Sequence, residues 1–175
     1  MNDFDFFVGT WDVANRRLLK RGVGSDEWEE FPGRCVAYGF FDGAGSFDTL
    51  TLPTKDFDGA TVRTYDAERD EWSIYWINSR RGLDPVPVVG RFVDGAGTFY
   101  ADDTDDGRPI RVRFTWAGIT SGSCHWEQAF SYDGARPGRP TGSWTPPAWG
   151  GPVTNPRPVA SVVASSAPMR QMEFP

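Results

Sequence analysis

The chain has 175 residues, of which 39% are hydrophobic and 24% are charged, and its formal net charge is −6. This length and composition predict a globular domain with its own core, and the negative charge argues against binding to nucleic acid or to an anionic membrane surface. Aromatic residues make up 15% of the chain, which favours either an aromatic-lined pocket or a β-rich core.

The N-terminal stretch MNDFDFFVGTW is acidic and aromatic, and it contains the only helical signal, a short turn between Asp3 and Val8. It lacks the basic start and the apolar run of a signal peptide. No segment approaches the ~20 consecutive apolar residues of a membrane span. We therefore expect a cytoplasmic protein that does not enter a membrane.

After this turn the apolar residues follow a period of two, which is typical of half-buried strands. In DEWSIYWINS, for example, Trp72, Ile74 and Trp76 share one face. Strands are expected, with some merging, around residues 10–19, 26–31, 34–41, 46–53, 60–66, 71–78, 87–93, 97–102, 110–117 and 123–132.

Asp-Gly pairs, which favour tight turns, separate these apolar runs. They occur at residues 42–43, 58–59, 94–95, 106–107 and 133–134, and DGAG occurs twice. Two similar turns explain that repeat more simply than a duplicated half-domain, which stays an alternative. Many antiparallel strands without helices predict an all-β barrel of about 8–10 strands, because closure removes the sheet edges. A β-sandwich is the alternative.

The stretch VGTWDV, from Val8 to Val13, has the Gly-x-Trp pattern that opens lipocalin-type barrels. With DFFVGTWDVANRRL, RTYDAERDEWSIYWINSR, GRPIRVRFTW and HWEQAFSYDG, it resembles a family of small bacterial calycin-like domains of unknown function. The resemblance covers about Asp3 to Gly134, and it implies a lipocalin-like barrel over residues 1–134 with no settled activity. Nitrobindin-type haem barrels are similar in outline, but their proximal histidine has no clear counterpart here.

The remaining segment, residues 135–175, has a different composition. It contains nine of the 14 prolines, one acidic residue and four arginines, so it carries a charge of +3 against −9 for the rest. The resemblance implies that the turn at Asp133 and Gly134 leads into a last strand of the type Thr-Trp-Glu-Thr-Asn-Trp. Residues 136–145 instead read RPGRPTGSWT.

One set of codons for RPGRPTGSWT is CGA CCT GGG AGA CCA ACT GGG TCA TGG ACC. Read from its third base, it encodes Thr-Trp-Glu-Thr-Asn-Trp-Val-Met-Asp. We therefore favour a frameshift near Ala135, with the residues after it translated out of frame. The alternative is a natural Pro-rich linker or lid.

A barrel without its last strand has an open edge, which favours aggregation. In the tail, PVASVVASS is the only β-prone run without an interior proline. We predict that Val159 to Ala164 pairs with an edge, either in its own molecule or in a neighbour, where exchange gives a homodimer. Trp144 and Trp149 are expected to pack on the barrel mouth.

Tryptophans on the apolar faces of different strands are the strongest indication of a site. If they converge, they line a pocket for an apolar or aromatic small molecule, although they can equally form a packed core. This interpretation needs no metal and no organic cofactor. The predicted ligand-binding residues are Trp11, Tyr75, Trp76, Asn78, Arg113, Trp116, Trp126, Gln128 and Tyr132.

His125, the only histidine, lies on the same strand face as Glu127, roughly 7 Å away. Such a pair can act as a general base and its orienting partner, which suggests a hydrolase, isomerase or cyclase working inside the barrel. The alternative is an exposed histidine, because the opposite face is more apolar. Arg113 is expected on the solvated face, or facing inward to a ligand's carboxylate, or paired with Glu127. A third possibility for the whole protein is an interaction protein with a vestigial pocket.

The sequence contains no strong metal signal. Cys35 and Cys124 are far apart in sequence, which disfavours a disulfide framework, and two thiols with one histidine cannot form a structural zinc site. The run DDTDDG crowds four carboxylates together, but their spacing is not that of a calcium loop.

The frameshift hypothesis is tested by the coding DNA. We expect the codons for residues 136–145 to encode the missing strand in another frame. Codons that do so in no frame would leave the Pro-rich linker as the explanation.

Overall fold

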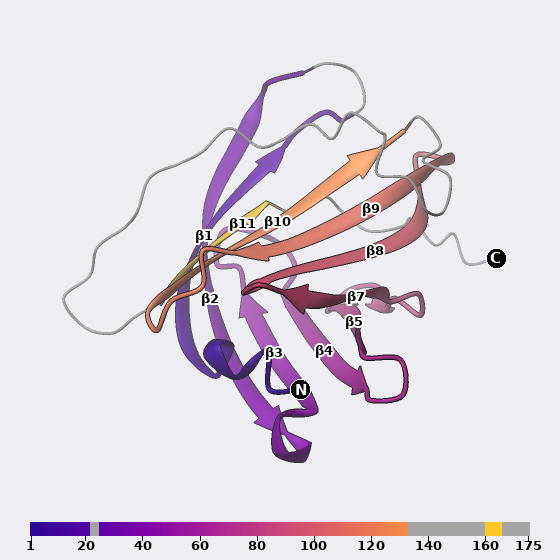
Figure 1. Ribbon diagram of the computed structural model, residues 1–175. Coiled ribbons are helices and arrows are strands. Elements are labelled where there is room, and N and C mark those ends of the chain that lie inside the picture. Colours follow the sequence, from indigo (N-terminus) through magenta and orange to yellow (C-terminus); the bar gives the residue numbers. More distant parts are fainter. Residues whose placement is uncertain (22–24, 133–159, 166–175) are drawn as a thin grey trace.

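The computed structural model describes residues 1–21, 25–132 and 160–165, which form an all-β fold (Figure 1). The predicted turns at Asp133 and Gly134 and the predicted packing of Trp144 and Trp149 lie outside these residues. The elements in chain order are η1 (Asp5–Phe7), β1 (Gly9–Leu18), β2 (Trp28–Phe40), η2 (Phe41–Gly43), β3 (Gly45–Thr51), β4 (Gly59–Asp66), β5 (Glu71–Asn78), β6 (Gly82–Leu83), β7 (Val88–Val93), β8 (Ala96–Asp105), β9 (Arg108–Ala117), β10 (Ser123–Ser131) and β11 (Ala160–Ser165).

The strands form one sheet that closes on itself, as its strong curl in Figure 1 suggests. Pairing runs from β1 through β2, β3, β4, β5, β7, β8, β9 and β10 to β11, which pairs back with β1. Every ladder is antiparallel except the two that β11 makes with β1 and β10. The predicted antiparallel barrel is therefore confirmed.

The strand boundaries follow the period-two pattern closely. The segments expected at 26–31 and 34–41 merge into β2, and β11 overlaps the segment 159–164 that was expected to pair with an edge. The pairs Asp94–Gly95 and Asp106–Gly107 have positive φ at both residues, as tight hairpin turns require. The pair at 58–59 is not such a turn, because Gly59 already begins β4.

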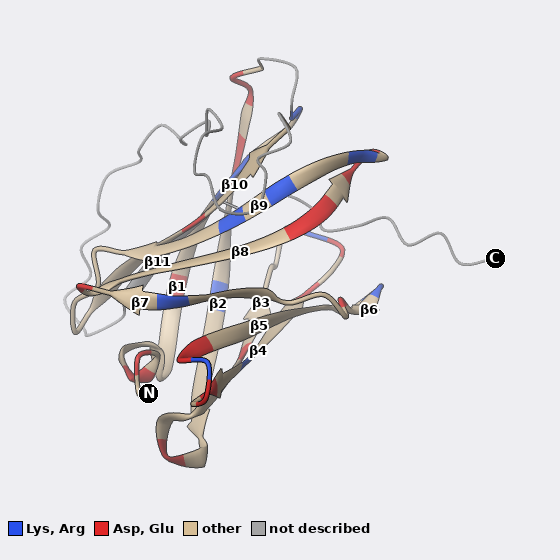
Figure 2. Cartoon of the chain, turned by 45° about the vertical axis from the view of Figure 1, so that its right-hand side comes forward, with Lys and Arg blue, Asp and Glu red and all other residues tan. Residues whose placement is uncertain are grey.

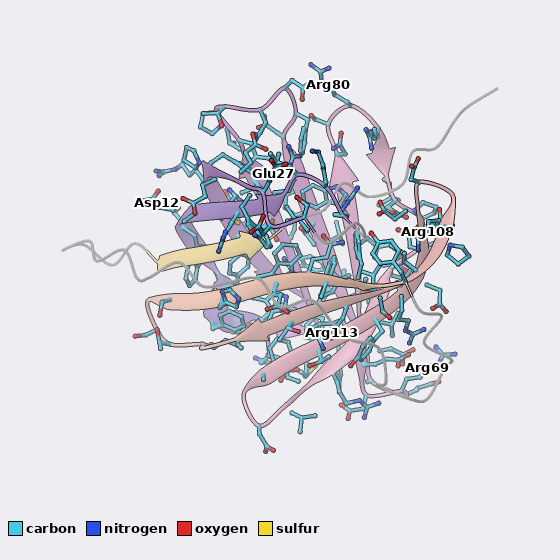
Figure 3. The ribbon with its side chains drawn as sticks, turned by 90° about the horizontal axis from the view of Figure 1, so that it is seen from above. Asp12, Glu27, Arg69, Arg80, Arg108 and Arg113 are labelled. Carbon is cyan, nitrogen blue, oxygen red and sulfur yellow. The ribbon has the colours of Figure 1, made fainter. Side chains whose placement is uncertain are left out.

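The ladder register shows which side chains point into the barrel, because paired residues share a face. Trp11 and Val13 are buried, and in Figure 3 Asp12 between them points away from the barrel. The same alternation holds in β9, where Phe114 and Trp116 are buried. The inward faces form one aromatic-rich core.

The N-terminal turn η1 fills the end of the barrel at which β1 begins (Figure 1). The ring of Phe4 packs edge-on against Trp72 and Trp116, with centroids 5.0 and 5.7 Å away. The indole N–H of Trp11 donates to the Phe7 carbonyl at 2.7 Å. The closed end is thus an aromatic plug, formed by the predicted short turn and the Gly-x-Trp motif of β1.

A buried ion pair joins this plug to the barrel wall. Arg63 on β4 and Asp48 on β3 lie 2.5 Å apart, and only 4% and 5% of their side chains are exposed. The guanidinium of Arg63 also lies over the rings of Phe4, Phe7 and Trp116, at 4.9, 5.3 and 5.5 Å from their centroids. Because neither charge contacts bulk water, each depends on the other.

We expect Arg63→Met to lower the free energy of unfolding by about 3–5 kcal/mol, because it leaves the Asp48 carboxylate buried without a counter-charge. The double variant Arg63→Met with Asp48→Leu should recover much of that loss. Urea unfolding followed by tryptophan fluorescence measures both values. Arg80→Met is the matched control, since its ion pair with Asp56 is largely exposed. If Arg63→Met costs no more than this control, the pair does not hold the plug.

Candidate functional site

The barrel separates the predicted site residues into two groups. Register and core contacts place seven of them on the inward face: Trp11, Trp76, Asn78, Trp116, Trp126, Gln128 and Tyr132. The other four lie on the outward face: Tyr75, Arg113, His125 and Glu127. Because the strands turn Tyr75 and Arg113 outward, the prediction that either residue contacts a ligand in the interior is not supported.

The inward tryptophans belong to two different levels of the barrel. Trp11 and Trp116 are 2% and 4% exposed and pack against the plug. Trp76 lies four residues beyond Trp72 on β5 and is only partly buried. Its ring lies directly over Gly59, and a Cβ added at Gly59 would come within 2.0 Å of that ring. Trp126 packs edge-on against Phe114, with centroids 5.0 Å apart. The interior wall is thus aromatic along much of its depth.

Two of the inward polar side chains already have partners. The carboxamide oxygen of Asn78 accepts hydrogen bonds from the backbone N–H groups of Arg80 and Arg81 at 2.9 and 3.2 Å, which orders the turn after β5. The hydroxyl of Tyr132 donates to Asp105 at 2.5 Å. Burial and this hydrogen bond raise the pKa of Tyr132, so its phenol stays protonated at neutral pH.

Among the described residues, three buried N–H donors on the inward face have no hydrogen-bond acceptor. They are Nδ2 of Asn15, Nε of Arg63 and Nε1 of Trp116, and their residues are only 3%, 3% and 4% exposed. Since most buried polar atoms are paired, such donors call for an explanation. Sequence reasoning missed Asn15 and Arg63. Asn15 shares the apolar face of Trp11 and Val13, a signal that was present, whereas ATVRTYD has no clear apolar face around Arg63.

The opposite end of the barrel carries a charged rim. Arg17 pairs with Glu29 at 2.7 Å, and Lys55 pairs with the same carboxylate. Arg21 pairs with Asp105 at 2.9 Å. Hydrogen bonds from Lys55 and then Arg17 lower the pKa of Glu29 despite its partial desolvation. The cations and carboxylates of this rim therefore form ion pairs with one another. The unpaired N–H donors lie deeper, among the buried residues.

His125, Glu127 and Arg113 meet on the outer face of β9 and β10. Nη2 of Arg113 lies 3.4 Å from Glu127, and Nε2 of His125 lies 3.8 Å from the other carboxylate oxygen. The expected pairing of Arg113 with Glu127 is thus present, and Arg111 on β9 likewise pairs with Asp102 on β8 at 2.8 Å. Figure 2 shows basic segments of β9, in blue, beside an acidic segment of β8, in red. The expectation of an acid–base pair inside the barrel is not met, because the strand alternation turns His125 and Glu127 away from the core.

The two cysteines offer no nucleophile. Both are free and buried on the inward side. Burial raises the pKa of Cys124 to about 12 and raises that of Cys35 as well, so both thiols are protonated at neutral pH. Across the described ranges 1–21, 25–132 and 160–165, no group of three or more His, Cys, Asp or Glu is arranged to hold a metal ion.

Compared with known proteins, the chain matches no family model and no curated protein. Within the part of the chain that the structure describes, no helix has the length and apolar character needed to cross a bilayer.

We expect Glu127→Gln to lower the free energy of unfolding by about 1 kcal/mol at neutral pH. The neighbouring imidazole of His125, followed by the positive charge of Arg113, lowers the pKa of Glu127 in the folded protein. Its ionised form thus adds stability above the ordinary carboxyl pKa of 4.5, and this contribution disappears as the pH falls through the lowered value. Urea unfolding from pH 7 to pH 3 measures the difference in free energy of unfolding between wild type and variant. A difference that stays constant over this range would contradict a stabilising role of the ionised Glu127.

Proposed function

We propose that the protein is a small-molecule-binding barrel whose interior takes an apolar or aromatic ligand that carries a neutral hydrogen-bond acceptor. The observation that supports this most directly is the set of spare donors on the aromatic inner wall, at Asn15, Arg63 and Trp116. Binding sites for small molecules are typically apolar, with a few placed polar groups. Apart from one oxygen of Asp48, which lies against the guanidinium of Arg63, these groups are donors, so a ligand oxygen with free lone pairs complements them.

The charge balance selects a neutral acceptor over a carboxylate. The charge of Arg63 is already matched by Asp48, and both side chains are almost fully buried. An anionic ligand beside this pair would place a second uncompensated negative charge in the core, which is costly in a low dielectric. A ketone, ester or amide carbonyl accepts from Nε of Arg63 or Nε1 of Trp116 without that cost.

The enzymatic alternative is less well supported by the side chains that face inward. His125 and Glu127 lie outside the barrel, the thiols are protonated, and the phenol of Tyr132 is bonded to Asp105. The inward carboxylate of Asp48 is held in its ion pair. A general base at neutral pH needs a free basic atom near the substrate, and these groups do not provide one.

The proposal is tested by three ligands of matched skeleton: 4-phenylbutan-2-one, butylbenzene and 4-phenylbutanoate. Tryptophan fluorescence should respond to the ketone with the highest affinity, because only it has both the apolar body and a neutral acceptor. A net hydrogen bond of about 1 kcal/mol predicts a preference of roughly 5-fold over butylbenzene. The carboxylate should bind most weakly. No response to any of the three would reject an apolar-ligand barrel.

Trp116→Phe isolates the role of the indole donor, because it removes Nε1 and keeps an aromatic ring. We expect the preference for the ketone over butylbenzene to shrink while butylbenzene binding changes little. Trp28→Phe is the matched control, because Trp28 lies on the outward face of β2, where Arg16 stacks over its ring. If both variants lose selectivity equally, the preference for the ketone does not come from the indole N–H of Trp116.

A further inference from the structure

The outer surface of β2, β3, β4 and β5 carries an aromatic and aliphatic row that runs across all four strands. The ladder register joins neighbouring strands through the residues of this row, which are Tyr38, Phe47, Val62 and Tyr75. A second row beside it consists of Val36, Thr49, Ala60, Ile77 and Leu83. Residues that alternate with these rows, such as Ala37 and Ile74, are buried in the barrel, so both rows face outward. We call the two rows together the outer apolar face.

The outer apolar face is accessible to solvent. Tyr38 is 57% exposed and Leu83 is 52% exposed. Among the described residues, the elements that β3 and β4 substantially contact are their neighbours in the sheet and η2, so no second layer packs on them. An antiparallel sheet that covers a core with one face normally carries polar residues on the other. A contiguous apolar surface in that position is typical of an interaction site.

The two ends of this face carry opposite charges. At the plugged end, the turn that joins β4 to β5 holds four carboxylates and one arginine, in the order Asp66, Glu68, Arg69, Asp70 and Glu71. At the other end, the turn that follows β5 contains Arg80 and Arg81 and no carboxylate. Figure 2 shows this contrast as red where β5 begins and blue beside β6. Between the two ends, neither row of the outer apolar face contains a charged side chain.

We propose that the outer apolar face binds the same face of a second copy of this chain, with the strands of the two copies antiparallel. A two-fold axis that crosses the strands at the level of Val62 places the row of Tyr38, Phe47, Val62 and Tyr75 against itself. The same axis brings the acidic turn of each copy, residues 66–71, to the arginines that follow β5 in the other copy. An axis along the strands would bring two acidic turns together, which is unfavourable.

The absence of charge in the two rows favours a second copy over a charged partner. The chain carries a net charge of −6, so two copies repel each other over most of their surface, and an uncharged face is where they can approach. A strongly basic peptide or a nucleic acid would find no counter-charge in the middle of this face. An apolar face that meets its own copy needs none.

The size of the face predicts a reversible dimer. Four strands about 4.8 Å apart, each with eight residues that rise about 3.3 Å, cover roughly 500 Å² per copy. The two copies together would then bury about 1,000 Å², which is at the lower limit for a specific interface. We therefore expect monomers and dimers to exchange, with the dimer populated at micromolar concentrations and above.

Sedimentation velocity of the full chain over a dilution series measures the dimer dissociation constant. Val62→Lys places two ammonium groups at the proposed axis, so it should raise that constant at least about 10-fold. Leu19→Lys is the matched control, because Leu19 is 54% exposed and lies after β1, outside the face, and it should change the constant little. Near-UV circular dichroism checks that both variants keep the wild-type fold. A wild-type chain that stays monomeric at every concentration would overturn the proposal, and so would a dimer that Val62→Lys leaves intact.

A second experiment tests the antiparallel arrangement with exposed turn residues. Arg80 pairs with Asp56, so the charge changes are made at Arg81 and at Glu68. At low ionic strength, Arg81→Glu and Glu68→Arg should each raise the dissociation constant about 5-fold, because each sets like charges against one another twice. The double variant restores opposite charges and should return to the wild-type value. Single variants that dimerise like wild type, or a double variant weaker than both, would contradict the antiparallel dimer.

Discussion

The barrel depends on a charge that is buried in its core and held there by aromatic rings. Arg63 reaches from β4 to Asp48 on β3, and the same guanidinium lies over Phe4, Phe7 and Trp116. One side chain thereby joins the wall, the plug and the far strand β9. Aromatic faces are attractive to a cation that has left water, so the plug contributes to the stability of the ion pair, and the pair orients the plug.

This arrangement also determines the character of the interior. An apolar barrel end with a neutralised ion pair and spare N–H groups has hydrogen-bond donors but no spare charge. The charged rim at the opposite end, where Glu29 serves both Arg17 and Lys55, is matched within itself. Recognition of a ligand in such an interior would come from apolar contact and from single hydrogen bonds, which give modest selectivity between ligands of similar shape.

Much of the fold was predictable because the sequence alternates strictly in β5, β9 and β10. Tyr75 shows the limit of that approach. Periodicity places it opposite Trp72, Ile74 and Trp76, yet it was predicted as a ligand-binding residue because its hydroxyl can make a polar contact. Arg63 was missed for a different reason. A buried arginine depends on Asp48 and on rings from the N-terminus, and such long-range partners leave no local pattern. Gly59 likewise looked like a turn residue, whereas it makes room for the ring of Trp76.

The closing position of β11 has a consequence for the order in which the protein folds. Its ladder with β1 joins Trp11 to Ala160 and Asn15 to Ala164, so the wall of the barrel cannot close until residues 160–164, far along the chain from β1, have been synthesised. The hairpins from β2 to β10 are local in sequence and form quickly, whereas contacts of such large sequence separation form slowly. Until β11 has been synthesised, β1 and β10 present unpaired edges, so the nascent barrel is exposed to misassembly during that interval.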